Sequence, residues 1–274
     1  MNYVCLNDHR DRLIEELRKK NIIMNPEMKK YIKEYGGPFH EFIKENVKVA
    51  EEENLPICQD TGMIEFFAFL PYNVCLDQPL QNFFDSIVSQ TYLENDFRYS
   101  TVIEPIGDRK NANDNSPAIV HIIQTNDHKI EIKFLVKGGG SENLSALFML
   151  KPSIDEEEIM DKIVQYVRDN GARGCPPLNI GIGIGGTSEK ATFLSKLALL
   201  EPFESRNIKR KYRKMEEQLL ERINRLNIGF QGLGEGITAY SVHIKEYPTH
   251  IAILPLALAF DCYISRKGCV QIEY

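Results

Sequence analysis

Several features are scarce in this sequence of 274 residues, and each shortage excludes a class of protein. The net charge is −6, so the chain lacks the basic excess with which proteins bind nucleic-acid phosphates broadly. The most apolar run, residues 251–260, is about half the length of a membrane span and contains Pro255. The polar start also lacks the apolar core of a signal peptide. We therefore expect a cytoplasmic protein without membrane segments.

Cysteines are few and widely spaced. The six are Cys5, Cys58, Cys75, Cys175, Cys262 and Cys269. They form no Cys-x-x-Cys pair and no compact zinc pattern, and a reducing compartment does not favour disulfides. A metal site would therefore have to be assembled from distant parts of the chain. Cys5, Cys75 and Cys269 have no special neighbours, and we interpret them as ordinary small apolar residues.

The pattern of apolar residues predicts a mixed α/β fold. Residues 9–53 are expected to be a helical N-terminal region, and further helices are expected over 78–95, 154–171, 187–200 and 206–226. Short runs rich in β-branched and aromatic residues predict strands at Ile64–Leu70, Thr101–Glu104, Ala118–Gln124, Glu131–Val136, Ile180–Ile184, Ile237–Ile244 and Ile251–Leu256. With no repeat, low-complexity tract or clear linker, residues 1–274 are predicted to form one domain, or one domain with two lobes.

Four segments differ from ordinary core or surface sequence. Residues 55–62 place a thiol, an amide, a carboxylate and a hydroxyl between Pro56 and Gly62. Residues 137–143 contain three consecutive glycines after a predicted strand, where exposed backbone amides can bind an anion. Residues 174–187 begin with Gly-Cys-Pro-Pro and continue into a glycine-rich run. Residues 249–262 begin with Thr-His-Ile-Ala and end with Asp-Cys.

Three cysteines lie in these turn-rich segments. Cys58 and Cys175 are flanked by proline, which stiffens a loop, and polar groups accompany Cys58 and Cys262. Three thiolates leave one iron of a four-iron cluster without a protein ligand, and that iron can act as a Lewis acid on a substrate hydroxyl and carboxylate. A cluster bound by four cysteines would suit electron transfer instead.

A second interpretation is a dinucleotide site, because residues 181–186 match Gly-x-Gly-x-x-Gly. The prolines leave only a short strand before these glycines, however, and no clear ribose-binding acid follows about 20 residues later. This interpretation predicts NAD(P) binding without iron.

At these residues the sequence resembles the α subunit of the class I, iron–sulfur-dependent fumarate hydratases and of the similar L(+)-tartrate dehydratases. The resemblance covers nearly the whole chain and is carried by Pro-Ile-Cys-Gln-Asp-Thr-Gly, Lys-Gly-Gly-Gly-Ser-Glu-Asn, Gly-Cys-Pro-Pro and Thr-His-Ile-Ala. It implies glycine-rich loops around a [4Fe-4S] cluster bound by Cys58, Cys175 and Cys262. The implied reaction is reversible addition of water to the C=C bond of a small dicarboxylate.

The resemblance also implies roles for other residues. Asp60 is expected to handle the proton of the departing hydroxyl, and His250 to hydrogen-bond it and tune it. Arg98 is expected to bind a substrate carboxylate, which suits a guanidinium. Gln59 and the backbone at Gly139 and Gly140 should complete the pocket, whereas Lys137 and Asn143 are interpreted as bracing the glycine loop.

In this family a further domain, fused or separate, supplies the base that removes the carbon-bound proton. The resemblance therefore implies a separate β subunit and an α2β2 assembly. The alternatives to fumarate hydration are dehydration of L(+)-tartrate to oxaloacetate and a non-catalytic metal-binding regulatory role.

Overall fold

The structure, a computed structural model, describes residues 2–274 and divides into two compact units. Unit 1 contains the residues up to Lys29 together with Glu41–Gly138 and Arg266–Tyr274. Unit 2 contains Lys30–His40 and Gly139–Ser265. Both units combine helices with β-sheet, so the predicted mixed α/β class is confirmed. The single domain over 1–274 stays a prediction.

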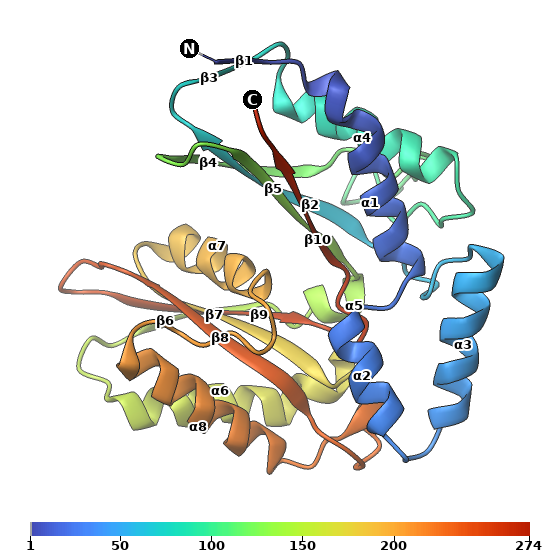
Figure 1. Cartoon of the computed structure of the whole chain (residues 1–274). Helices are drawn as coiled ribbons and strands as arrows, with labels where there is room; N and C mark the ends of the chain where they lie inside the picture. The colour runs from blue at the N-terminus through green and yellow to red at the C-terminus, as the bar shows by residue number, and fades with distance from the viewer. Residues whose placement is uncertain (1) are drawn as a thin grey trace. The chain divides into compact units, whose positions relative to one another are not determined.

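Unit 1 has a four-stranded sheet with two helices on one face (Figure 1). The strand order is β10 (Lys267–Ile272), β5 (Ile130–Lys137), β2 (Met63–Pro71) and β4 (Ile119–Thr125), and only the β2–β4 pair is parallel. The covering helices are α1 (Arg10–Ile22) and α4 (Leu80–Leu93). Alternate β2 residues such as Phe66 and Ala68 face these helices, and the Phe66 ring stacks on Phe84 at 4.1 Å. This alternation buries one face of the sheet.

Other segments complete the first half of the chain. Strands β1 (Asn2–Val4) and β3 (Val74–Leu76) form a parallel pair. The predicted helical N-terminal region contains α1, α2 (Pro26–Glu34) and α3 (His40–Glu53). Here the helical prediction from apolar periodicity is confirmed.

Unit 2 has a sheet covered on both faces. The strand order is β6 (Ala146–Leu150), β9 (Leu254–Asp261), β7 (Leu178–Gly185) and β8 (Ala239–Tyr247), with β7 and β8 parallel and the other pairs antiparallel. Helix α7 (Ser188–Leu199) covers one face, and α6 (Glu156–Asn170) and α8 (Arg210–Asn224) cover the other (Figure 1). The isoleucines of β7 pack into the core with α6 and α8.

The alternating glycines of β7 face helix α7. A Cβ atom on Gly181 would lie 2.0 Å from the Ser195 carbonyl oxygen, and one on Gly183 would lie 1.9 Å from that of Ala191. Only glycine allows a helix backbone to approach a strand this closely. Close packing therefore explains the first two glycines of the Gly-x-Gly-x-x-Gly match without a nucleotide.

Two kinds of difference separate the predicted and observed strands. The strand predicted at Thr101–Glu104 is wrong, apart from an isolated bridge between Val102 and Asn111. The backbone N–H groups of Ser100 and Thr101 donate to the Asn115 side chain at 2.6 and 3.2 Å, so a side chain satisfies part of this backbone instead of a sheet. The last predicted strand is shifted, because its first residues form the β8–β9 turn.

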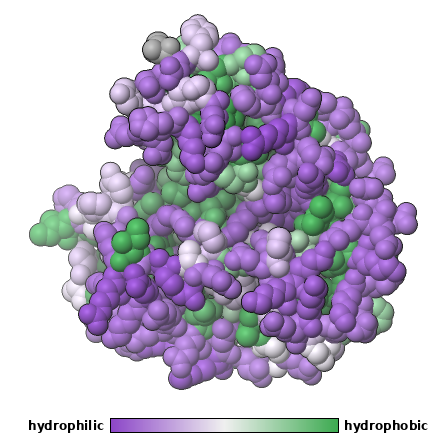
Figure 2. Space-filling model, in the orientation of Figure 1, coloured by the Kyte–Doolittle hydropathy of each residue, from purple (hydrophilic) through white to green (hydrophobic). Residues whose placement is uncertain are grey.

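Strands β1, β3, β6 and β10 were not predicted. They are short, or they lack a clear alternation that tells a strand from a loop. Among residues 2–274, no helix is both long enough and apolar enough to cross a bilayer. Figure 2 shows a mostly hydrophilic face with scattered hydrophobic patches.

Candidate functional site

The loop Ile57–Gly62 in unit 1 is anchored by buried polar groups. The Ile57 N–H donates to the Asn21 carbonyl at 2.9 Å, and the Tyr92 hydroxyl donates to the Thr61 carbonyl. The Asn115 amide donates to the Gly62 carbonyl at 2.9 Å. Asn21, Tyr92 and Asn115 are all buried. These bonds give the segment that carries Cys58, Gln59 and Asp60 a defined shape although it is neither helix nor strand.

Within this loop, Asp60 accepts a hydrogen bond from the Gly62 N–H through Oδ1 at 3.0 Å. Gly62 has φ +75°, and a Cβ there would lie 2.9 Å from the Lys137 carbonyl oxygen, so this turn requires glycine. Asp60 is half-buried, and its second oxygen faces Gly138. The carboxylate is therefore fixed at one oxygen by the backbone of its own turn.

Arg98 lies next to this loop. The Thr61 hydroxyl donates to the Arg98 carbonyl oxygen, while Arg98 itself is exposed. Gln59 is also exposed, and the Cys58 thiol lies 3.9 Å from its Oε1. Within unit 1 the structure thus brings together Cys58, Gln59, Asp60 and Arg98.

In unit 2, the two predicted cysteine ligands occupy neighbouring turns. Cys175 precedes β7, Cys262 follows β9, and the antiparallel pairing of these strands puts both turns at one end of the sheet. The Tyr263 N–H donates to the Cys175 carbonyl at 3.1 Å, and the Tyr240 hydroxyl donates to the Cys262 carbonyl at 3.1 Å. Cys175 is exposed and Cys262 half-buried, and Cys175 has the left-handed φ of +54°.

The glycine turn belongs to the same end of unit 2. Gly139 and Gly140 begin the single-turn helix α5 (Gly139–Glu142), whose Glu142 forms an ion pair with Lys196 of α7. The nearest atom to a Cβ on Gly140 would be the Arg173 carbonyl oxygen at 3.9 Å, two residues before Cys175. Packing therefore does not require glycine at position 140, and the exposed backbone there is open to a ligand.

His250 lies at the other end of the unit 2 sheet. It is exposed in the turn between β8 and β9, where its Nδ1 accepts from the Ala252 N–H at 3.1 Å. Gly185 at the end of β7 pairs with Tyr247, so this turn is a full strand length from Cys175 and Cys262. The eight residues of β7 correspond to about 25 Å. The structure does not bring His250 together with the two cysteines of its own unit.

Three buried residues of unit 1 that belong to no motif are connected to the Asp60 turn. Arg266, just before β10, faces Asp60 across Gly138; Asn21 of α1 binds Arg266, and Tyr92 of α4 binds the Thr61 carbonyl. The pKa of the Tyr92 hydroxyl is raised, chiefly by burial. The Asp60 charge adds to this increase, and the Arg266 charge opposes it. No local motif marks these residues, because only the fold gathers them.

The donor groups present are chemically suited to iron. Thiolates are the usual ligands of iron–sulfur clusters, and each of the three predicted cysteines is at least partly accessible. Within residues 2–274, the structure holds no ready group of three or more acidic, cysteine or histidine side chains around one point. Two cavities of unit 2, of about 620 and 450 Å³, include none of the predicted site residues in their linings.

Comparison with known proteins gives the class. The fumarate hydratase (fumerase) family matches residues 24–271. This chain belongs to that family, and it is a hydro-lyase.

Individual relatives point the same way. The chain is 34% identical over 278 residues to a Methanocaldococcus jannaschii protein with the provisional name L(+)-tartrate dehydratase subunit alpha, covering 96% of this chain and 97% of that protein. It is 29% identical over 231 residues to the L(+)-tartrate dehydratase subunit alpha of Escherichia coli strain K12, covering 84% of this chain and 76% of that protein. The protein of the same name from Shigella sonnei matches to the same extent.

Proposed function

We propose that this chain is the α subunit of a [4Fe-4S] hydro-lyase that interconverts fumarate and L-malate with a separate β subunit. The meeting of the Cys175 and Cys262 turns beside the open backbone of Gly140 is the observation that carries this proposal. Cys58 would be the third ligand. When bound, the cluster supplies a Lewis-acidic iron for the substrate hydroxyl and carboxylate. A reducing compartment such as the cytoplasm would keep the three thiols available.

The remaining site residues of this chain bind substrate and move a proton. Asp60 would protonate the hydroxyl that leaves as water during dehydration, and it would take a proton from water in the reverse direction. The exposed guanidinium of Arg98 would bind one substrate carboxylate, with Gln59 and the backbone at Gly139 and Gly140 binding other substrate oxygens. The β subunit would supply the base that removes the carbon-bound proton.

A second copy of the chain would supply His250. About 25 Å of strand separates this side chain from the cysteines of its own unit 2, which is beyond the reach of a histidine. Tyr247 at the end of β8 and Ile251 in the turn are also exposed, Ile251 to 89%. Apolar side chains on a projecting turn favour contact with another protein surface. An α2β2 assembly with His250 contributed between α subunits accounts for both observations.

Dehydration of L(+)-tartrate is the second candidate, and the names of the relatives favour it. Tartrate carries one hydroxyl more than malate, so the two reactions require the same cluster and the same acid. The choice between them depends on groups that contact the additional hydroxyl.

One preparation tests both reactions. The chain is reconstituted anaerobically with its β subunit, iron and sulfide, and kcat/KM is measured with fumarate, L-malate and L(+)-tartrate. Turnover of fumarate and malate in preference to tartrate supports the proposal, and preference for tartrate replaces it with the second candidate. A complex with a full cluster and no turnover of any of the three would contradict both and favour a regulatory role.

A further inference from the structure

Gly138 is the point at which two charged side chains of unit 1 meet. A Cβ atom built on Gly138 would lie 3.1 Å from Asp60 Oδ2 and 3.6 Å from Arg266 Nη2. The missing side chain therefore leaves Asp60 and Arg266 facing each other across one glycine. Lys137 is a second buried cation at this turn, and its Nζ donates to the Gly138 carbonyl at 3.5 Å.

Arg266 is held in place on its other side. The residue is only 4% exposed, and its Nη1 donates to Asn21 Oδ1 at 2.9 Å. Its carbonyl oxygen accepts from the Val136 N–H at 2.8 Å, which joins this residue to the strand that leads to Gly138. Burying a guanidinium is costly unless polar or charged groups compensate it, and Asp60 is a carboxylate on the Nη2 side.

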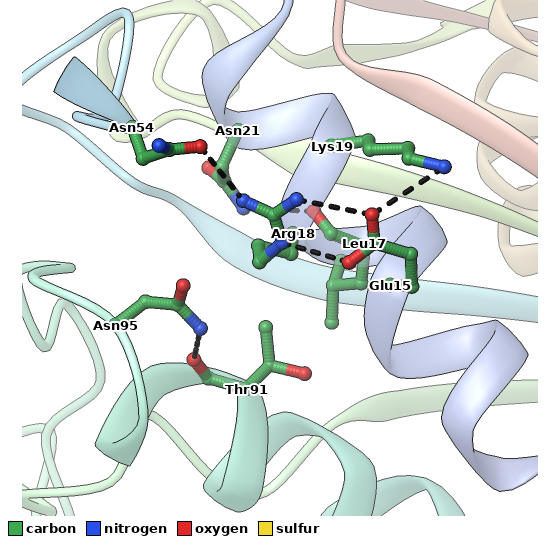
Figure 3. Close-up of polar contacts among 8 residues, drawn as sticks. All are labelled: Glu15, Leu17, Arg18, Lys19, Asn21, Asn54, Thr91 and Asn95. Atoms are coloured by element: carbon green, nitrogen blue, oxygen red, sulfur yellow. Dashed lines mark hydrogen bonds and ion pairs between the residues drawn. The ribbon is translucent and has the colours of Figure 1, made fainter. Parts of the chain in front are cut away.

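Asn21 is itself oriented by its helix. The Asn21 amide donates to the Leu17 carbonyl of α1 at 3.4 Å, as Figure 3 shows. Because Nδ2 is used in this way, Oδ1 is the atom available to Arg266. The backbone carbonyl of Asn21 also accepts from Ile57, so one residue anchors both Arg266 and the loop that carries Asp60.

Tyr92 lies near the same two charges. Its hydroxyl donates to the Thr61 carbonyl, one residue after Asp60. Asp60 and Arg266 are both near enough to act on its pKa in opposite directions. The Asp60 carboxylate thus has its Oδ1 fixed by the Gly62 N–H and its Oδ2 directed toward Gly138 and Arg266.

We propose that Arg266, held by Asn21, is a positioning residue that orients the Asp60 carboxylate for proton transfer, an inference that rests on the proposed function. The attraction between guanidinium and carboxylate favours the Asp60 rotamer whose Oδ2 faces Gly138. Removing the guanidinium takes away the charge that favours this rotamer. Because Arg266 is buried, it acts on the reaction through Asp60 and not by binding substrate.

Three variants test this role in the full chain reconstituted with its β subunit. Arg266→Met removes the charge, Arg266→Lys keeps it without the planar fork, and Gly138→Ala inserts a methyl group between the two side chains. Arg10→Met is the matched control, because it removes a half-buried arginine of the same unit that donates to Ser86 and Gln90. Iron content and thermal unfolding are recorded for each protein.

We expect the variants to change kcat and not KM. Misplacing a catalytic group costs about 100-fold, so kcat should fall by about that factor in Arg266→Met and Gly138→Ala, while KM stays within about threefold of wild type. Arg266→Lys should recover part of kcat, and Arg10→Met should leave it unchanged. A raised KM with unchanged kcat would overturn the proposal, because Arg266 would then bind substrate directly.

A measurement without activity separates this inference from the proposed function. Crystal structures of the cluster-free full chain, wild type and Arg266→Met, should show the Asp60 carboxylate turned away from Gly138 in the variant alone. If Asp60 moves in the variant but the wild-type complex has no hydro-lyase turnover, the proposed function is wrong and the positioning role of Arg266 stands. If Asp60 does not move in Arg266→Met and the kcat of that variant stays within twofold of wild type, the positioning role is wrong and the proposed function stands.

Discussion

The backbone N–H of Tyr263 donates to the carbonyl of Cys175 at 3.1 Å, and this bond joins two turns that are almost 90 residues apart in the sequence. The next residue back from Tyr263 is Cys262. Two thiols from distant motifs are therefore carried by turns that are tied to each other. The predictions for the cysteines follow from this pairing.

Cys175→Ser and Cys262→Ser should each abolish stable cluster binding, because a hydroxyl is a poor replacement for a thiolate on iron. We expect iron per chain, measured by metal analysis after anaerobic reconstitution, to fall by more than half, and hydro-lyase activity to be lost. Cys269→Ser is the control. Burial and Glu131 raise the pKa of the Cys269 thiol to about 11, so it stays protonated at neutral pH. Equal iron loss in all three variants would contradict this assignment.

Asp60→Asn should lower kcat by roughly 100- to 10,000-fold without loss of the fold, because the amide keeps an acceptor for the Gly62 N–H and cannot transfer the proton. Asp114→Asn is a matched control, since Asp114 accepts from the Ser116 N–H at 3.0 Å in a similar turn. Steady-state kinetics and thermal unfolding of both variants provide the comparison. An Asp60→Asn enzyme with wild-type kcat would exclude Asp60 as the acid.

Gly183→Ala should affect stability, whereas Gly140→Ala should affect substrate binding. A methyl group on Gly183 would meet the Ala191 carbonyl oxygen at 1.9 Å, so we expect a loss of about 1–3 kcal/mol in the free energy of unfolding. A methyl group on Gly140 meets nothing closer than 3.9 Å, so stability should be kept while KM rises. Denaturant unfolding and kinetics test the pair. NAD(P) binding lost in Gly183→Ala at unchanged stability would instead support the dinucleotide interpretation.

Subunit mixing tests whether His250 acts from a second copy. Chains with Asp60→Asn and chains with His250→Asn should each be nearly inactive when expressed alone with the β subunit. Random pairing of the two variants on co-expression should restore about a quarter of wild-type activity, because half of the symmetric assemblies would contain one site with both residues intact. Size-exclusion chromatography checks that assemblies form. No recovery in correctly assembled mixtures would mean that His250 does not complete the site of another copy.

The fold could be predicted from the sequence wherever periodicity was strong. Alternation along Ile64–Leu70 and the apolar stripe of residues 154–171 correspond to β2 and α6. Thr101–Glu104 has the same composition as a strand, yet Asn115 holds its backbone in another conformation. Propensity describes single residues, whereas this outcome depended on a partner 14 residues further along the chain.

The candidate site, too, could be predicted from the sequence only in part. The sequence by itself determined the family and the chemical groups, because Cys58, Asp60, Cys175 and Cys262 stand in specific motifs that composition alone would not produce. Only the tertiary structure decided that Arg266, bound to Asn21, faces Asp60 across Gly138, and that His250 lies a strand length from the cysteines of its unit. The physical reason is that strand pairing and helix packing bring together residues that are far apart in the sequence. The backbone hydrogen bonds that hold these residues in place leave no motif in the sequence.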